Sequence, residues 1–471
     1  MVFSNIIFLY FFLPLFLWGY FLVPKAYRNP FILLGSCVFY AWESPRFIFV
    51  ILATTFLDFQ FVQKMDSTDS SLQRKGWLLL SLSLNLGLLF YFKYCNFFIE
   101  NANYFLSLAG IQNITWLKLA LPIGISFYTF ETITYLVDVY RKVHKPLRNF
   151  WDYQLYIMLF PKLIAGPIIR YHEISAQIQD RIETPELRLR GFYRFMIGLA
   201  KKVLIANVMA AYCADIYQHS PDTTGQFGAW IGALAYTFQL YFDFSGYSDM
   251  AIGIGMMMGF RFPENFNSPY SAQSITDFWR RWHITLGAWM RNYLYIPLGG
   301  NKNGNLYLNL CIVFLASGLW HGAAWAFVFW GAYHGFFLVI ERAFLGKYLQ
   351  KIPPVFAIFY TFMVVLIGWV FFNLADFGRA SSFLRIMFWG NSRSSYSPQI
   401  DTMMVFYMSI AAFFSFMGAF SSGRNLQNSI FNSEYSEKKH YLFSFISLIL
   451  LVLCTAKIIG SDFNPFIYFR F

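Results

Sequence analysis

Long apolar runs recur along almost the whole chain and restrict what it can fold into. A helix needs about 20 apolar residues to cross a hydrocarbon core about 30 Å thick, and runs near this length lie at 4–23, 77–99, 116–138 and 441–460. Of the 471 residues, 57% are hydrophobic and 13% are charged. These features predict an all-α polytopic membrane protein with about eleven to thirteen transmembrane helices.

Two stretches are interrupted by prolines and glycines, unlike the simple spans. The 150–190 region begins apolar but is broken by Pro161 and Pro167, and the 262–304 region consists of short amphipathic pieces between prolines and glycines. Irregular backbone at membrane depth persists only where protein or a water-filled cavity satisfies its polar groups. We therefore expect re-entrant or interfacial segments here, around a cavity that opens to the cytoplasm.

The charge pattern indicates orientation and excludes a nucleic-acid partner. The net charge is +12, but the Lys and Arg residues sit in short loops between apolar runs, as the positive-inside rule requires. We expect Met1–Val23 to be a retained first helix, because it lacks a basic start and a small-residue cleavage site. The five cysteines are scattered, so neither disulfides nor a metal site is expected. No linker divides the chain, which predicts a single integral membrane domain over 1–471.

The first candidate for chemistry is His321, in the motif SGLWHGAAW (Ser317–Trp325). An ionisable side chain inside an apolar region is costly unless it has a partner or a task. Gly318 and Gly322 flank it and allow close backbone approach. His321 is either a structural histidine bonded to a neighbouring carbonyl or a general base, because a neutral imidazole can accept a proton from a hydroxyl near neutral pH. The pattern favours the base.

The second candidate is His283, in DFWRRWHITL (Asp277–Leu286). On a continuous helix, Arg280 would share roughly one face with His283. Arg280 and Arg281 among aromatic residues either anchor this piece at lipid headgroups or hold a phosphate-bearing donor through their guanidinium groups. His283 would then orient or assist the reaction.

Other polar residues within apolar runs have simpler interpretations. We interpret His334 as structural, and the run Gly253–Gly259 as a helix–helix contact of small residues. Four acids lie within apolar segments, where they either pair with basic residues or line a pathway, and we favour the packing role: Glu131, Asp138, Asp243 and Asp249.

The chain ends in an aromatic tail, 461–471, that includes Tyr468. Aromatic rings are common at the membrane interface, so an interfacial belt explains the tail without further function. A phenolic nucleophile is the alternative interpretation of Tyr468, and the residue pattern alone does not favour it.

Taken together, several motifs resemble the membrane-bound O-acyltransferase family, within it the bacterial alginate O-acetyltransferase type. They begin with the opening VFSNIIFLYFFLP, continue through the core motifs of 121–335 and include the two histidine motifs. The others are LPIGISFYTF (Leu121–Phe130), PKLIAGPI (Pro161–Ile168), FDFSGYSDMAIG (Phe242–Gly253) and YIPLGGN (Tyr295–Asn301).

The resemblance implies a helical bundle around a central funnel, with His321 at the family's catalytic position and His283 at its second functional histidine. It also implies an O-acetyltransferase of the cell inner membrane that moves acetyl groups from cytoplasmic acetyl-CoA toward an exported polysaccharide. No bound cofactor is implied. A periplasmic partner with a hydrolase-like domain would complete the transfer, and Tyr468 matches the acyl-carrying tyrosine of related systems.

These implications lead to a mechanistic hypothesis. Acetyl-CoA would enter beside Arg280, Arg281 and His283, with Trp279 and Trp282 alongside, and His321 would activate the attacking hydroxyl. Tyr468 would be the first acceptor, since an aryl ester can pass its acyl group onward. A transporter or channel that exports a glycan precursor is a competing hypothesis, although no repeated halves are visible. A third is an enzyme of this family that acylates peptidoglycan, a lipid or a secreted protein.

Overall fold

The computed structural model describes residues 1–471 except 303, 391–395, 397, 399 and 461–471. Within the described residues the chain is helical and forms no strand, and its one β-type contact is an isolated bridge between Phe266 and Trp282. The predicted all-α class is therefore confirmed. The aromatic tail with Tyr468 lies outside the described residues.

The contacts of the chain group into two compact units. The first unit comprises Met1–Leu187 and Gly255–Pro263, and the second comprises Arg188–Ile254 and Glu264–Phe471. The single integral membrane domain expected over 1–471 stays a prediction.

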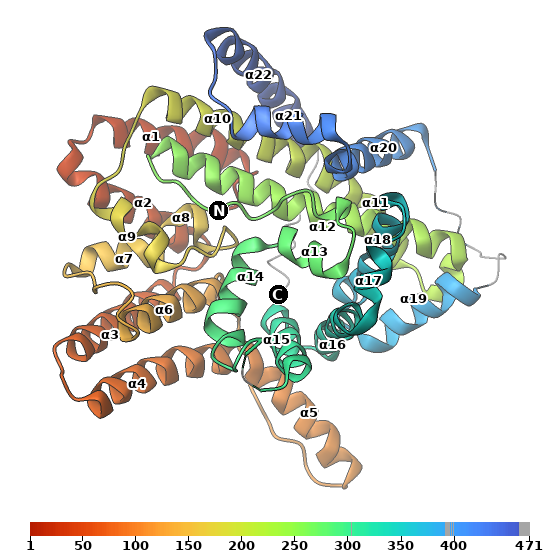
Figure 1. Cartoon of the computed structure of the whole chain (residues 1–471), viewed down its shortest axis with the longest axis horizontal. Helices are drawn as coiled ribbons and strands as arrows, with labels where there is room; N and C mark the ends of the chain where they lie inside the picture. The colour runs from red at the N-terminus through yellow and green to blue at the C-terminus, as the bar shows by residue number, and fades with distance from the viewer. Residues whose placement is uncertain (303, 391–395, 397, 399, 461–471) are drawn as a thin grey trace. The chain divides into compact units, whose positions relative to one another are not determined.

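In the first unit α3, α4 and α6 lie side by side (Figure 1), and α7 packs against both α2 and α3. The stretch after α6 is broken into short helices, as its prolines predict, and Leu159 separates two of them in a non-helical conformation. The elements are η1 (Phe8–Phe12), α1 (Leu13–Leu22), η2 (Lys25–Tyr27), α2 (Arg28–Glu43), α3 (Ile48–Asp66), α4 (Ser71–Leu89), η3 (Phe90–Tyr94), α5 (Cys95–Leu108), α6 (Ile125–Tyr140), α7 (Phe150–Met158), α8 (Phe160–Leu163) and α9 (Tyr171–Gln179).

The second unit contains both histidine motifs. Its first helix and the long α12 each extend a few residues past the unit's limits. The elements are α10 (Pro185–Ala200), η4 (Lys201–Ala206), α11 (Asn207–Gln218), α12 (Pro221–Met257), η5 (Pro269–Ser271), α13 (Ile275–Arg281), α14 (Ile284–Met290), η6 (Arg291–Tyr295), α15 (Leu306–His321), α16 (Trp325–Ile340), η7 (Glu341–Leu345), α17 (Gly346–Leu349), α18 (Pro354–Asn373), α19 (Phe377–Trp389), α20 (Thr402–Phe416), η8 (Met417–Ala419), α21 (Ser421–Phe431) and α22 (Glu437–Ile459).

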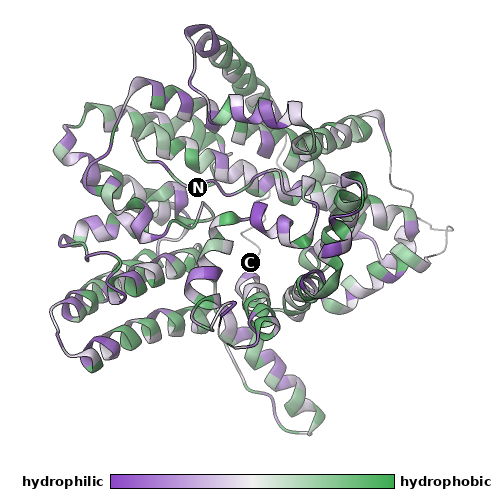
Figure 2. Ribbon diagram, in the orientation of Figure 1, coloured by the Kyte–Doolittle hydropathy of each residue, from purple (hydrophilic) through white to green (hydrophobic). Residues whose placement is uncertain are grey.

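Several of these helices are long and apolar enough to cross a membrane, and apolar residues predominate along α18 in Figure 2. Two shorter apolar helices lie at Phe8–Leu22 and Leu306–His321. The chain is thus a multi-pass membrane protein, while the predicted number of about eleven to thirteen crossings stays a prediction. Among the described residues the six long candidates are Ile48–Asp66, Ser71–Leu108, Pro185–Gln218, Pro354–Asn373, Thr402–Ala419 and Glu437–Ile459.

Glycines bring α10 and α12 into close contact. A Cβ atom on Gly253 would lie 2.5 Å from the Gly191 carbonyl oxygen, and one on Gly246 would lie 2.7 Å from that of Gly198. Small residues at such crossings let two backbones approach without an intervening side chain. The interpretation of Gly253 as part of a helix contact is confirmed.

The acids within apolar segments pair with basic residues, as the packing interpretation predicts. In the second unit, Asp243 pairs with Lys202, and Asp249 pairs with both Arg194 and Lys201. In the first unit, Glu131 forms a fully buried ion pair with Lys162, and Asp138 contacts His172 at 3.0 Å.

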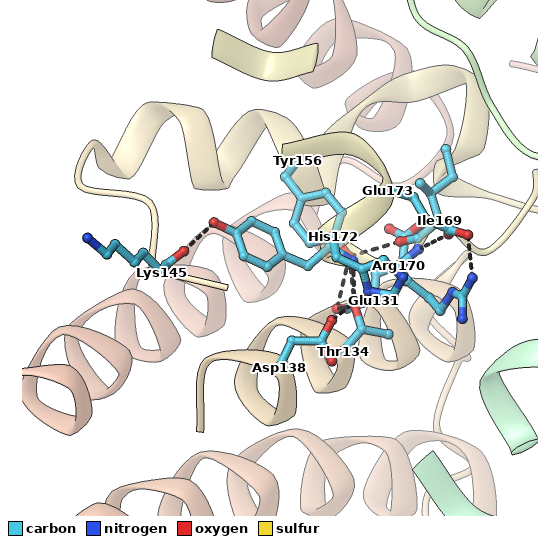
Figure 3. Close-up of polar contacts among 10 residues, drawn as sticks. Glu131, Thr134, Asp138, Lys145, Tyr156, Ile169, Arg170, His172 and Glu173 are labelled. Atoms are coloured by element: carbon cyan, nitrogen blue, oxygen red, sulfur yellow. Dashed lines mark hydrogen bonds and ion pairs between the residues drawn. The ribbon is translucent and has the colours of Figure 1, made fainter. Parts of the chain in front are cut away.

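The Glu131–Lys162 pair belongs to a larger set of polar contacts that we call the α6 polar network: Glu131, Thr134, Tyr156, Lys162 and Ile169. Figure 3 shows Glu131, Thr134, Tyr156 and Ile169 of this network. The Glu131 carboxylate also accepts from the Ile169 amide at 3.4 Å, and the Tyr156 hydroxyl lies 2.9 Å from both the Ile169 carbonyl and the Thr134 hydroxyl. A buried charge is tolerated when it is paired and hydrogen-bonded. This network ties α6 to α7, α8 and the backbone that precedes α9.

Candidate active site

The tight pairing of α15 and α16 positions His321. Their backbones meet at two glycines: a Cβ atom on Gly318 would lie 2.3 Å from the Phe327 carbonyl oxygen, and one on Gly331 would lie 2.3 Å from that of Phe314. His321 is the last residue of α15, and Gly322 follows in an extended conformation. The predicted close backbone approach is confirmed at Gly318, while a Cβ atom on Gly322 would meet the side chain of Phe327 and not a backbone.

His321 lies in an aromatic pocket and is only 4% exposed. Its ring centroid is 4.9 Å from Trp320, 5.1 Å from Trp330 and 5.0 Å from Phe372. Trp330 and Phe372 come from α16 and α18. Apolar rings on several sides therefore exclude water from His321.

The segment that carries His283 differs from the sequence prediction. Helix α13 ends at Arg281, Trp282 is extended, and His283 adopts the left-handed region at φ 45° and ψ 54° before α14 begins. Arg280 and His283 therefore do not share the face of one helix, and that expectation is wrong. A left-handed conformation is uncommon for a residue other than glycine, so the surroundings must hold His283 in place.

Asn265 makes the contacts that hold His283. Its Oδ1 lies 3.0 Å from the His283 Nδ1, and it also accepts from the Thr285 amide at 3.3 Å and the Thr285 hydroxyl at 2.9 Å. The Asn265 backbone carbonyl accepts from the Ile284 amide at 3.0 Å. One buried asparagine thus binds the ring of His283 and the backbone on its C-terminal side.

The second ring nitrogen of His283 has a different environment. His283 is 1% exposed, and its Nε2 has no hydrogen-bond partner among the described residues. Burial lowers the pKa of His283 to about 3, because a low-dielectric surrounding disfavours the imidazolium. The imidazole is therefore neutral near pH 7 and presents an unsatisfied nitrogen.

Aromatic rings join the two candidate histidines. The His283 ring lies 6.1 Å from Trp320, whose ring lies 4.9 Å from His321. On the other side of His321, Trp330 lies 5.1 Å from both His321 and His334. We call this set the histidine cluster: His283, Trp320, His321, Trp330 and His334.

His334 is fully enclosed, as is Trp330 of the same cluster. It is 0% exposed, and neither ring nitrogen has a hydrogen-bond partner among the described residues. Its ring packs edge-on against Trp279 at 4.9 Å. A Cβ atom on Gly368 would lie 2.7 Å from its Nε2, so α18 needs a glycine at this position.

Helix α13 is held against the end of α16 by a carboxylate. Glu341 is buried and accepts from the Ile275 amide at 2.6 Å, the Thr276 amide at 2.9 Å and the Thr276 hydroxyl at 2.8 Å. A carboxylate at a helix N-terminus satisfies amides that have no partner within the helix. Glu341 and Asn265 therefore fix the two ends of the segment that leads to His283.

The predicted donor-binding residues have distinct environments. Arg280 is exposed, and Arg281 is 2.9 Å from the Asp277 carboxylate. Trp279 packs against Trp330 at 5.5 Å, and Trp282 is buried 4.9 Å from Trp369. Trp279 therefore packs directly on the histidine cluster, and Trp282 is linked to it through Trp369. The arginines lie toward the surface.

The structure thus gathers most of the predicted site residues into one region of the second unit, with Tyr468 outside the described residues. It also adds Asn265, Glu341 and Trp320, which the sequence analysis did not select. Trp320 adjoins His321 in the motif and could have been inferred from it. Asn265 lies 18 positions before His283, and no periodicity relates a loop residue to a partner at that distance.

This arrangement is suited to group transfer by buried acid–base catalysis. It combines a neutral imidazole at His283, water exclusion and hydrogen-bond acceptors within a membrane-embedded helical frame. Ionisable side chains buried in an integral membrane protein mark a candidate functional site.

Comparison with known proteins identifies the family. The model of the MBOAT, membrane-bound O-acyltransferase family, matches residues 140–376. The chain is 40% identical over its full length to the full-length probable alginate O-acetylase AlgI of Pseudomonas putida. Over 88% of the chain it is 44% identical to the protein of that name from Azotobacter vinelandii, covering 85% of that protein.

A further relative is the peptidoglycan O-acetyltransferase of Helicobacter pylori, 37% identical over 82% of this chain and 80% of that protein. The chain therefore belongs to the membrane-bound O-acyltransferase family and is an O-acyltransferase that uses an acyl donor. The resemblance drawn from the sequence motifs is confirmed. Asn265, His283, His321 and His334 all lie within the residues matched by the family model.

Proposed function

We propose that this protein is an O-acetyltransferase of the cell inner membrane that uses cytoplasmic acetyl-CoA to acetylate an exported polysaccharide. The observation that carries the proposal is the burial of His283 and His321 in one aromatic cluster. The full-length similarity to alginate O-acetylases supports acetyl as the group transferred and alginate or a related glycan as the acceptor. Because the chain belongs to an enzyme family, we set aside the exporter hypothesis.

His321 is the proposed catalytic base. It would take the proton from an attacking hydroxyl while the hydroxyl oxygen forms a bond to the thioester carbonyl carbon. The tetrahedral intermediate would then collapse, the carbon–sulfur bond would break, and the proton would pass to the departing thiolate of CoA. The aromatic walls formed by Trp320, Trp330 and Phe372 support this role, because they keep water away from the imidazole and the thioester.

His283 is the proposed partner on the donor side. Its free Nε2 can accept a hydrogen bond from a hydroxyl or thiol, and its chain neighbours Arg280 and Arg281 can bind the phosphates of acetyl-CoA. The exposure of Arg280 supports this assignment. Trp279 and Trp282 would form the wall that separates the donor from lipid.

Tyr468 is the proposed first acceptor of the acetyl group. A phenol becomes a good nucleophile once a base removes its proton, and the resulting aryl ester is activated for onward transfer. Neither acetyl-CoA nor a polymer would then need to cross the bilayer. A periplasmic partner with a hydrolase-like domain would take the acetyl group from Tyr468 and pass it to the polysaccharide.

The direct test is to incubate the purified protein with isotope-labelled acetyl-CoA and to analyse its C-terminal peptide by mass spectrometry. We expect labelled acetyl on Tyr468, none on a Tyr468→Phe variant, and none on His321→Ala at equal protein levels. An unlabelled Tyr468 in a complex that still acetylates glycan would remove the relay. Labelling of Tyr468 in His321→Ala would remove His321 as the base.

A second acceptor is favoured by one specific similarity. The Helicobacter pylori relative is named a peptidoglycan O-acetyltransferase, so cell-wall glycan is the alternative polymer. Comparing the O-acetyl content of peptidoglycan and of secreted polysaccharide in cells with and without the gene separates the two. Loss of acetyl from only one polymer identifies the acceptor.

A further inference from the structure

We infer that Asn265 is a positioning residue that fixes His283 in the tautomer whose Nε2 is a hydrogen-bond acceptor. The inference rests on the proposed function of His283 and specifies how that residue acts. Asn265 would not touch the substrate itself. It would act through the imidazole that it orients.

The first step is the orientation of the Asn265 side-chain amide. The Thr285 backbone amide can only donate, and it lies 3.3 Å from the atom assigned as Oδ1. A flipped amide would place an NH₂ group against this N–H, with two donors facing each other. The opposite end of the amide lies 3.1 Å from the Ser248 hydroxyl, which can accept. Only the assigned orientation satisfies both contacts.

The second step is the position of the proton on His283. Because Oδ1 is an acceptor, the His283 Nδ1 at 3.0 Å must carry a hydrogen. A neutral imidazole has one protonated nitrogen, so Nε2 carries the lone pair. The hydrogen bond at one ring nitrogen thus decides the chemistry of the other, as in histidines whose second nitrogen binds a metal or takes a proton.

The third step is the backbone. His283 is one of three residues other than glycine with positive φ among those described, and such conformations persist only where the surroundings enforce them. The Asn265 carbonyl binds the Ile284 amide at 3.0 Å, directly after the left-handed residue. Asn265 therefore controls both the direction of the His283 ring and its tautomer.

This assignment restricts what His283 can recognise. A neutral acceptor at Nε2 binds a hydroxyl or thiol hydrogen, whereas a phosphate needs a donor. Recognition of the phosphates of acetyl-CoA would then fall to the arginines of α13. His283 would contact the reacting groups.

The test measures thiol release from acetyl-CoA as a function of pH, using purified full-length protein carrying substitutions at Asn265. In Asn265→Ala the ring loses its fixed tautomer, and we expect the maximal rate to fall on the order of 100-fold. Asn265→Asp retains an acceptor oxygen, so its maximal rate should stay near wild type. Its carboxylate favours the imidazolium, so the acidic limb of its pH profile should move to higher pH by about one unit or more.

The matched controls are Asn267→Ala and Asn267→Asp, two residues away on the same loop, where the side chain is exposed. Both should match wild type in rate and in pH profile. Size-exclusion chromatography checks the folded state of each variant. If Asn265→Ala does not fold, the shift in the acidic limb of the Asn265→Asp pH profile tests whether Asn265 positions His283.

The possible failures are distinguishable. Wild-type activity in His283→Ala would refute the proposed role of His283 and, with it, this inference. An inactive His283→Ala together with a wild-type rate in Asn265→Ala would overturn the Asn265 inference alone. Two results for Asn265→Asp would also overturn the Asn265 inference alone. One is a rate as low as that of a folded Asn265→Ala. The other is an active Asn265→Asp whose pH profile keeps the wild-type acidic limb.

Discussion

The α6 polar network in the first unit and the histidine cluster in the second are both buried. They differ in whether their buried polar atoms have hydrogen-bond partners. In the network, Lys162 neutralises Glu131, and backbone groups bind the remaining oxygen atoms. In the cluster, the Nε2 of His283 and both ring nitrogens of His334 have no hydrogen-bond partner among the described residues.

The difference matters because an unpartnered buried polar atom is costly, while a paired one is not. A satisfied network stabilises one packing of the helices. The unpaired Nε2 of His283 has no such structural benefit and is held in place by Asn265, which is why we propose chemistry for His283 and packing for the network. Four substitutions test this contrast, in order of decreasing effect.

The largest effect is expected at His321. His321→Ala should lower acetyl transfer about 10²- to 10⁴-fold, the usual contribution of a general base, with little change in the folded fraction. Acetyl-CoA turnover by purified protein and size-exclusion chromatography measure the two quantities. The exposed His144 provides the control, since His144→Ala should match wild type. Equal activity in both variants would show that His321 has a structural role and is not the catalytic base.

In the α6 polar network we expect a substitution to lower the stability of the fold and not the activity directly. Glu131→Gln leaves the Lys162 charge buried without its partner and should lower the free energy of unfolding by about 3–5 kcal/mol. Thermal unfolding in detergent measures the loss. The double variant Glu131→Gln with Lys162→Met removes the buried charge and should recover much of the stability. If the single variant were inactive at full stability, the network would belong to the catalytic machinery.

His334 sharpens the contrast within the cluster. We interpret it as structural, because Trp330 lies between it and His321. His334→Phe removes two unsatisfied nitrogens and keeps an aromatic ring, so stability should rise by about 1 kcal/mol while activity stays within about twofold. Melting temperature and turnover are measured on the same preparation. A large loss of turnover at normal stability would add His334 to the site.

The smallest effect is expected at the surface pair of α13. Asp277 and Arg281 are each 30% exposed and are four residues apart, and such pairs contribute about 0.3–0.5 kcal/mol. Asp277→Asn should therefore change stability by less than 1 kcal/mol. It also releases Arg281, so the KM for acetyl-CoA should stay unchanged or fall. A clear rise in this KM would show that Arg281 contributes to acetyl-CoA binding only while it is paired with Asp277.

The sequence determined the class of fold and selected two histidines that the structure places in one aromatic cluster. Apolar runs of membrane-spanning length can only become helices in a bilayer, and a histidine inside such a run stands out because its burial is costly. The short helices of 150–190 followed from their prolines. The pairing of acids such as Glu131 and Asp249 followed from the cost of burying a charge alone, although their basic partners did not.

Only the tertiary structure decided how these residues work together. Helical periodicity extends along one helix, so it wrongly placed Arg280 beside His283, where the chain turns through a left-handed residue. The contact between His283 and Asn265 joins the end of a loop to the start of α14, and the contact of Trp320 with both histidines joins separate helices. Such contacts depend on how distant segments pack, and local sequence patterns carry no information about that packing.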